Sequence, residues 1–273
     1  FFFLIFQRIS MLKMMEEICC DLKLSNESQA QATNAFLKPF ILDHDTVTKI
    51  KSIFESELEK GLRHGLKGSS LQMENTYVSQ LTNGSEDGSY LALDLGGTNF
   101  RVMLLEMSKG KIVKEEVEYY SVSESTRLGP GQQLFDFLAQ CIADFVSKTL
   151  SKESQENSIP LGFTFSFPME QQGLNKGILV AWTKSFNASG VVGQDAVKML
   201  NEAIKKLNLN INVVAILNDT TGTLVKGAYD DPKTCIGLIL GKKNNKIGEF
   251  WIKVETDNKN SLSTITSQDG RAV

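Results

Sequence analysis

Cysteine, histidine and proline are scarce in this chain of 273 residues, which contains four, two and five of them. The cysteines are Cys19, Cys20, Cys141 and Cys235. They lack the spacing of metal ligands, and the adjacent pair would form a strained disulfide, so the sequence predicts neither a disulfide framework nor a metal site built on cysteine. This usage is typical of a reducing compartment inside the cell, and we expect the cytoplasm.

Long hydrophobic runs are also missing. The apolar stretch at residues 1–6 is far shorter than the ~20 residues that a membrane-spanning helix needs. No basic stretch precedes it and no small-residue cleavage site follows, so we expect no signal peptide. The chain does not begin with methionine, which indicates a fragment or a true start at Met11, Met14 or Met15. Weak association of this N-terminus with a membrane, such as the mitochondrial outer surface, is the alternative.

Neither sign of charge dominates the chain. Twenty-nine basic and thirty-two acidic residues give a net charge of −3 and a pI near 5.6, which argues against a general nucleic-acid binder. Hydrophobic residues are 41% and charged residues 22%, as in an ordinary soluble globular protein. The mass of 30.3 kDa corresponds to one large domain or two modest ones.

Residues 45–65 have the period of an amphipathic helix. Asp45 or Thr46 is the expected cap, and Gly61 and Gly65 mark the expected end. The apolar residues recur at steps of three and four, namely Val47, Ile50, Phe54, Leu58 and Leu62. Residues 68–89 are polar and rich in turn residues, which predicts a linker.

Beyond the linker, short strands and helices alternate. Three apolar runs separated by glycine turns, at 90–95, 100–106 and 111–120, predict a strand meander. Further strands are expected at 159–167, 212–217 and 235–240, and helices at 134–145, 192–207 and 220–227. This order predicts an α/β sheet with crossover helices. From residue 242 the sequence is polar and unpatterned, and we expect poor order apart from a strand at 249–254.

The first run leads into the motif Asp94-Leu-Gly-Gly-Thr-Asn-Phe-Arg101. A carboxylate at a strand end followed by two glycines makes a turn in which a phosphate can approach backbone N–H groups closely. Asp94 is a candidate ligand of Mg²⁺ through water, and Arg101 is a candidate for stabilising a transferred phosphoryl group. An ordinary hairpin turn is the alternative. The spacing fits neither a Walker loop nor a dinucleotide fingerprint.

The second motif is Leu161-Gly-Phe-Thr-Phe-Ser-Phe-Pro168, followed by residues 177–186. Ser166 fixes a hydroxyl at a strand end, and Trp182-Thr-Lys184 places an apolar ring beside a hydroxyl and a cation. A neutral polyol needs such a set of hydrogen-bonding groups around an apolar wall. Taken singly, each piece is better explained by an alternating strand with Trp182 in the core.

The third motif is Ala215-Ile-Leu-Asn-Asp-Thr-Thr-Gly-Thr223, in which an apolar strand runs into a threonine-rich helix start. Asp219 has two interpretations. It is either a helix cap or a general base, because the carboxyl ends of strands are where α/β sheets place such groups. The motif alone leaves these interpretations even.

In combination, the three motifs resemble the hexokinase family, the two-lobed sugar kinases of the actin-like ATPase superfamily. Residues 161–186 are similar to the family's sugar-binding signature, 91–101 to its first phosphate motif and 218–220 to its catalytic strand end, in the same order. The resemblance runs from about residue 40 to 241. It implies an α/β fold of the actin-like ATPase (ribonuclease H-like) type, with a small lobe that is nearly complete and a partial large lobe.

The resemblance also implies roles for individual residues. Asp219 would take the proton from the 6-hydroxyl of glucose or a related hexose as that oxygen attacks the γ-phosphate of MgATP, with Lys184 and Arg101 also catalytic. The implied sugar ligands are Ser166, Thr183, Lys184, Asn218 and Asp219. The implied ligands of ATP and Mg²⁺ are Asp94, Gly96, Gly97, Thr98, Asn99 and Arg101.

The sequence departs from the family pattern after residue 241. Gly241-Lys-Lys-Asn-Asn-Lys stands in place of a second phosphate loop, Gly-Thr-Gly-x-Asn-Ala, and nothing resembles the later Asn-x-Glu-Trp-Gly segment or the adenosine motif. Earlier in the chain, Asn75 stands where the family usually has a proline. We expect a truncated isoform, an intron-derived tail or a mispredicted gene, and therefore impaired turnover. The alternatives are a non-catalytic sugar-binding remnant, or another kinase of the superfamily, against which the segment from Ser166 to Lys184 argues.

The predicted organisation follows from this resemblance. Residues 1–85 are expected to be an N-terminal helical segment of the large lobe, 86–217 the small lobe, 218–241 the start of the large-lobe core and 242–273 a divergent tail. Without the rest of the large lobe, the helices at 45–65 and 220–227 should expose apolar faces.

Overall fold

The computed structural model describes residues 26–40, 42–97, 99–234, 236–243, 246–255 and 262–266. The chain divides into two compact units, Phe1–Ser70 and Leu71–Val273. The predicted boundaries at 85, 217 and 241 remain predictions.

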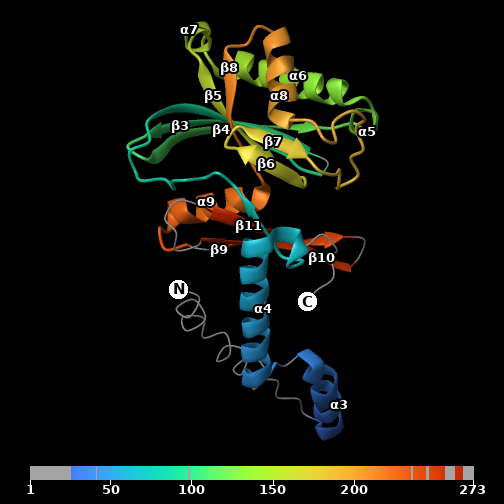
Figure 1. Cartoon of the computed structure of the whole chain (residues 1–273). Coiled ribbons are helices and arrows are strands. Elements are labelled where there is room, and N and C mark those ends of the chain that lie inside the picture. The colour runs from blue at the N-terminus through green and yellow to red at the C-terminus, as the bar shows by residue number, and fades with distance from the viewer. Residues whose placement is uncertain are drawn as a thin grey trace. The chain divides into compact units, whose positions relative to one another are not determined.

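The first unit consists of helices joined by short turns (Figure 1). They are α3 (Glu27–Leu37), η1 (Lys38–Phe40), α4 (His44–His64) and η2 (Gly65–Lys67). Helix α4 is the one predicted from the apolar period, but neither expected residue caps it. Asp43 is the cap, because its Oδ1 accepts the N–H of Thr46 at 2.7 Å. The helix ends where Gly65 takes a φ of 56°, which glycine adopts at little cost.

The second unit is built around a five-stranded mixed sheet in the order β4-β3-β2-β5-β8 (Figure 1). Its strands are β2 (Gly88–Leu95), β3 (Asn99–Ser108), β4 (Lys111–Ser121), β5 (Ile159–Phe165) and β8 (Ile211–Leu217). Strands β2, β3 and β4 form the expected antiparallel meander, and β5 and β8 run parallel to β2. The predicted α/β class is therefore confirmed, with all five strands inside the segment expected to be the small lobe.

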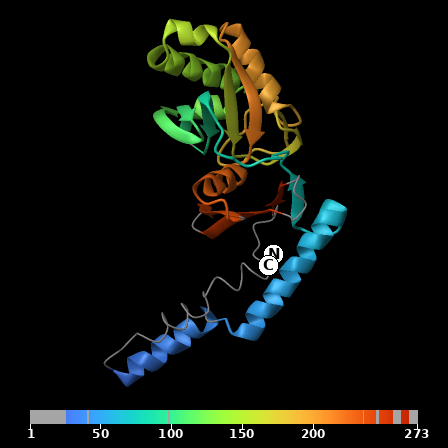
Figure 2. The same ribbon diagram turned by 90° about the vertical axis from the view of Figure 1, so that its left-hand side faces the viewer.

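The helices after the meander are α5 (Glu124–Leu128), α6 (Gly131–Thr149), α7 (Lys152–Glu156) and α8 (Ala196–Lys206). The two longer of these, α6 and α8, cover one face of this sheet (Figure 2). Leu91, Leu93 and Leu95 alternate along β2 and are fully buried in the core that α6 and α8 share. Helix α8 begins later than its pattern suggests, because Asp195 caps it by accepting the N–H of Val197 at 3.0 Å.

The remaining elements are a hairpin, a helix and a second sheet. They are β6 (Met169–Gly173), β7 (Lys176–Leu179), α9 (Asp219–Asp230), and β1 (Gln72–Asn75), β9 (Ile236–Lys243), β10 (Lys246–Glu255) and β11 (Leu262–Thr266) in the order β1-β11-β10-β9. Strand β10 contains the strand predicted at 249–254. Strand β1 lies in the predicted linker, and β11 in a stretch for which no strand was predicted. These two pair with each other, and such pairing leaves no local signal in the sequence.

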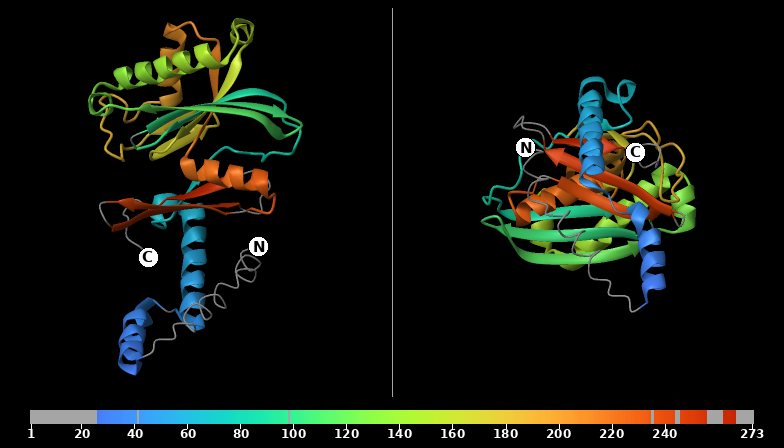
Figure 3. Two further views of the ribbon diagram at one scale, coloured as in Figure 1. Left: turned by 180° about the vertical axis from the view of Figure 1, so that it is seen from behind. Right: turned by 90° about the horizontal axis from the view of Figure 1, so that it is seen from below.

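The two helices expected to expose apolar faces behave differently. In α4, Leu58 is buried, but Ile50, Ile53 and Leu62 are 49%, 44% and 56% exposed. In α9 the expectation was wrong: Leu224 is 1% exposed, because this helix packs against β9 and β10 (Figure 3). None of the helices in the described part of the chain combines the length and the hydrophobicity of a membrane span.

Candidate active site

The three motifs meet at the carboxyl edge of the parallel strands. Asp94 on β2 stands beside Thr164 on β5, and Thr164 stands beside Leu217 on β8. Because neighbouring strands are about 4.8 Å apart, this row places β2 and β8 about 10 Å from each other. The two glycines follow β2, Ser166 follows β5, and Asn218-Asp219 follow β8. The register thus brings all three motifs to one edge of the sheet.

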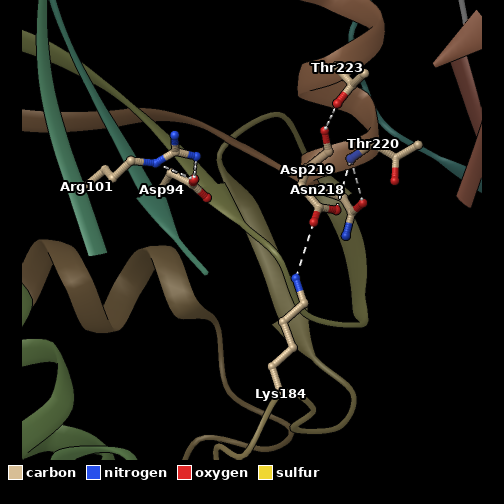
Figure 4. Close-up of polar contacts among 7 residues, drawn as sticks. All are labelled: Asp94, Arg101, Lys184, Asn218, Asp219, Thr220 and Thr223. Carbon is tan, nitrogen blue, oxygen red and sulfur yellow. Dashed lines mark hydrogen bonds and ion pairs between the residues drawn. The ribbon is translucent and has the colours of Figure 1, made fainter. Parts of the chain in front are cut away.

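Asp94 and Arg101 pair with each other across the β2–β3 hairpin (Figure 4). The Nε of Arg101 donates to Oδ2 of Asp94 at 3.0 Å, and a terminal guanidinium nitrogen contacts the same oxygen. This hydrogen bond is the main reason why the pKa of Arg101 is raised above its ordinary value. The guanidinium engages only one carboxylate oxygen, so Oδ1 is not used by the pair.

Lys184 and Asp219 form the second charged pair (Figure 4). The Nζ of Lys184 lies 3.3 Å from Oδ2 of Asp219, and the two side chains are 38% and 25% exposed. The backbone of Gly97 adjoins this pair, since a Cβ added there would lie 3.6 Å from Cβ of Lys184. The glycine turn, the lysine and the aspartate are therefore contiguous. An ion pair this exposed contributes only about 0–1 kcal/mol to stability, so folding energetics alone do not account for it.

The start of α9 fixes the direction of the Asp219 side chain. Asn218 is the N-cap, and its Oδ1 accepts the N–H of Thr220 at 3.1 Å. Oδ1 of Asp219 accepts the same N–H at 3.0 Å, which leaves Oδ2 toward Lys184. Thr223 donates its hydroxyl to the Asp219 carbonyl at 3.0 Å. Asn218 rather than Asp219 is therefore the N-cap of the helix, and the general-base interpretation of Asp219 stays a prediction.

A strained turn presents Lys184. The N–H of Phe186 donates to the carbonyl of Thr183 at 3.0 Å, and the two central residues, Lys184 and Ser185, have φ values of 54° and 66°. Two positive φ values define a type I′ turn, which strongly prefers asparagine and glycine. Non-glycine residues in this region cost about 1 kcal/mol or more each, and such strain gathers at functional sites. We call residues 183–186 the Lys184 turn.

Ser185→Gly is expected to give a free energy of unfolding about 1 kcal/mol higher than Ser189→Gly gives, because both variants gain freedom in the unfolded chain but only glycine at 185 relieves a positive φ. Urea denaturation of the full chain measures the change. Ser189→Gly is the matched control: Ser189 is exposed and has no positive φ, so glycine there only adds freedom to the unfolded chain and lowers stability. Equal losses in both variants would contradict strain in the Lys184 turn.

Trp182 belongs to the packing beneath the site rather than to a sugar-facing wall. Its indole N–H donates to the carbonyl of Ala188 at 2.8 Å. Its ring contacts three phenylalanines, with centroid distances of 4.7 Å to Phe167, 5.5 Å to Phe186 and 6.0 Å to Phe165. The core interpretation of Trp182 fits this geometry. The ring cluster supports the segment from which the Lys184 turn projects.

Ser166 and Thr183, the other predicted sugar ligands, lie at element ends. Ser166 is 5% exposed and is the centre of a tight turn in which Phe167 N–H donates to the Phe165 carbonyl at 2.9 Å. This turn ends β5 two residues before the strand end predicted from sequence. Thr183 is half-buried and begins the Lys184 turn.

The glycine motif is described only in part. Gly96 follows β2 and Asn99 begins β3, whereas Thr98 lies outside the described residues. No contact described among the placed residues joins the Asp94–Arg101 pair to the Lys184–Asp219 pair. Within the same described ranges, no group of three acidic, histidine or cysteine side chains could hold a metal ion.

Sequence reasoning missed two residues that support the site. Arg127, at the end of α5, has its Nη1 3.4 Å from the Ser185 carbonyl, and its own carbonyl accepts the Asn187 N–H at 2.9 Å. Gln171, on β6, donates to the carbonyl of Ile216 at 2.8 Å. Neither residue belongs to a motif, because each acts through backbone groups that are distant in sequence.

The five-stranded sheet, an antiparallel meander followed by two parallel strands in the order β4-β3-β2-β5-β8, is of the type found in the actin-like ATPases. Solved structures agree. A hexokinase from Schistosoma mansoni complexed with glucose superimposes with a TM-score of 0.69 at 33% identity, over 87% of this chain and 54% of that one. Another hexokinase crystal structure gives a TM-score of 0.76 at 31% identity, over 88% and 57%.

Sequence comparison gives the family. The hexokinase family model matches residues 32–229. Hexokinase-3 from Homo sapiens is 47% identical over 210 residues, which are 77% of this chain and 22% of that protein. A hexokinase from Kluyveromyces lactis is 43% identical over 202 residues, 74% of this chain and 41% of that protein. The chain belongs to the hexokinase family, and it spans less than half the length of either relative.

Proposed function

We propose that this chain binds glucose or a related hexose and carries the machinery for transfer of the γ-phosphoryl group of ATP to the sugar 6-hydroxyl. The observation that carries the proposal is the contiguous set of Gly97, Lys184 and Asp219, with 3.3 Å between Nζ and Oδ2 of the charged pair. Phosphoryl transfer requires an aligned hydroxyl, a group to receive its proton, and cationic groups near the phosphate. The carboxyl edge of the sheet supplies each type.

Asp219 is the proposed base. Its Oδ2 faces outward from the start of α9 and would accept the proton of the 6-hydroxyl. Lys184 holds that oxygen in place and donates to the sugar. Asn218, whose Nδ2 is not engaged by the capping bond, together with Ser166 and Thr183, would complete the hydrogen bonds to the sugar.

The residues present suit a metal–phosphate group at the glycine turn. Gly97 has no side chain, and a Cβ there would occupy the space beside Lys184. Oδ1 of Asp94 is the kind of oxygen that Mg²⁺ prefers, directly or through water, and Arg101 lies beside it. When bound, MgATP supplies the phosphoryl group and the charge of the metal. Asp94, Gly96, Gly97, Thr98, Asn99 and Arg101 are the residues proposed to hold that end.

Impaired turnover is part of the proposal. Strand β9 continues through Lys243, so residues 241–243 are extended strand where the family resemblance calls for a second phosphate loop. A strand turns only alternate backbone N–H groups to one side, whereas a loop can gather several on one phosphate. This observation favours a second candidate, a sugar-binding protein that does not turn over. A cytoplasmic location remains a prediction.

One pair of experiments separates these candidates. Calorimetric titration with glucose is expected to show binding, and MgATP is expected to tighten it if the nucleotide end is functional. A coupled assay then measures glucose 6-phosphate. Binding of glucose without any effect of MgATP would favour the non-catalytic candidate, robust turnover would refute impairment, and failure to bind glucose or any related hexose would refute the sugar site.

A further inference from the structure

The β6–β7 hairpin joins the two halves of the proposed sugar site. Strand β6 begins three residues after Ser166, and the Lys184 turn follows four residues after β7 ends at Leu179. Among the described elements, neither strand of the hairpin pairs with a strand of the five-stranded sheet. Its position relative to β8, which carries Asn218 and Asp219, must therefore come from other contacts.

Two hydrogen bonds at one residue make that connection. Gln171 donates its Nε2 to the carbonyl of Ile216 at 2.8 Å, and the N–H of Ile216 donates to the carbonyl of Leu174 at 2.8 Å. Strand β8 is at the edge of the five-stranded sheet, so its outward backbone groups need partners from outside the sheet. The hairpin satisfies both groups of Ile216.

Close packing reinforces the same contact. Gly177 on β7 stands opposite Gln171 in the hairpin. A Cβ added to Gly177 would lie 3.2 and 3.3 Å from two side-chain carbons of Ile216 and 2.9 Å from the sulfur of Met169. The absence of a side chain at 177 therefore lets the hairpin approach β8 closely enough for the Gln171 bond to form.

We propose that Gln171 is a positioning residue, which holds β8, and with it the following Asn218-Asp219, in register with the hairpin that connects Ser166 to the Lys184 turn. Ile216 lies two residues before Asn218, so a shift of β8 against the hairpin changes the 3.3 Å separation between Lys184 and Asp219. Gln171 touches no reacting group itself. The role rests on the proposed sugar site, although the contact with β8 does not.

Gln172 offers a matched control. It is the next residue on β6, it is exposed, and its Nε2 donates to Oε1 of Glu170 on the same strand at 3.0 Å. Methionine has nearly the shape of glutamine but cannot donate a hydrogen bond. Gln171→Met therefore removes the hydrogen bond from Gln171 to the Ile216 carbonyl, which we call the clamp on β8. Gln172→Met removes an amide that has no contact with β8 among the described hydrogen bonds.

The test is calorimetric titration of the full chain with glucose. Gln171→Met is expected to weaken glucose binding about tenfold, and Gln172→Met less than twofold. Gln171→Glu adds a diagnostic pH profile. The ionised carboxylate repels the Ile216 carbonyl at neutral pH, but the protonated acid donates to it, so affinity relative to the natural chain recovers as the pH falls below about 5. A general loss of packing would show no such recovery.

Equal glucose affinity in Gln171→Met and Gln172→Met would overturn the proposal. If the natural chain binds no glucose, the proposed sugar site is refuted, and the role of Gln171 is tested by hydrogen exchange of the Ile216 amide. Faster exchange in Gln171→Met than in Gln172→Met supports the clamp, and equal exchange overturns it. If Gln171→Met does not fold, Gln171→His, which keeps an N–H donor, replaces it. Folding with retained affinity then supports the clamp, and folding with affinity lost overturns it.

Discussion

Asp219→Asn is expected to lower the rate of the proposed glucose phosphorylation by about 10²- to 10⁴-fold, the usual contribution of a positioned general base. Asparagine keeps the size of the side chain but cannot take the proton of the 6-hydroxyl. The helix start should survive, because Asn218 still accepts the Thr220 N–H at 3.1 Å. Direct detection of glucose 6-phosphate at high protein concentration measures the rate even when turnover is slow.

Asp230→Asn is the matched control for this variant. Asp230 ends the same helix, and its carboxylate pairs with Lys226 on the surface, far along the helix from Asp219. Its loss should leave the rate unchanged and alter stability by less than about 1 kcal/mol, as for other exposed ion pairs. Equal rates in the two variants would show that Asp219 is not the base. A large loss of stability in Asp219→Asn alone would show that the carboxylate serves the fold instead.

Most of the five-stranded sheet could be predicted from local pattern. Glycine turns separate β2, β3 and β4, and the apolar period of α6 is unbroken, so each element depends mainly on residues close to it in sequence. Elements whose partners are distant were harder to predict. Strand β1 is short and pairs with β11 at a separation of nearly two hundred residues, although β11 also pairs with the nearby β10. The face of α9 is covered by β9 and β10, which the sequence did not place there.

The candidate site divides in the same way. Placing Asn218-Asp219 and Ser166 at one edge needed only the rule that parallel strands end on the same side of a sheet. The contact between Lys184 and Asp219 could not be predicted by that rule, because no residue type in the loop that contains Lys184 indicates its conformation. A type I′ turn normally contains glycine or asparagine, and here it contains lysine and serine. Strain of this kind is imposed by the surrounding packing and leaves no signal in the turn itself.

The pairing of Asp94 with Arg101 also depended on register. The sequence assigned both residues to the phosphate end, but seven positions apart they could have faced opposite sides of the sheet. The β2–β3 hairpin sets them directly opposite each other, and a hairpin with one extra residue would separate them. The chemistry could be inferred from residue types, and the geometry only from the fold.

Trp182→Ala is expected to lower the free energy of unfolding by about 3 kcal/mol, at the lower end of the range for buried tryptophan because the ring is only partly buried. The substitution leaves a cavity among Phe165, Phe167 and Phe186, and it removes the donor to the Ala188 carbonyl. Urea denaturation measures the loss. A loss of this size is a large part of a typical free energy of unfolding of about 5–15 kcal/mol, so the variant would be markedly less stable.

Trp182→Phe separates the two causes. Phenylalanine keeps an aromatic ring against its three neighbours but leaves the Ala188 carbonyl without its donor, so we expect a smaller loss of about 1–2 kcal/mol. If both variants lose the same amount, the hydrogen bond rather than the ring packing holds this segment. The Lys184 turn begins one residue after Trp182, and the cluster supplies the rigidity that its strained backbone requires. Glucose affinity should therefore fall more steeply in Trp182→Ala than in Trp182→Phe, in step with the loss of packing.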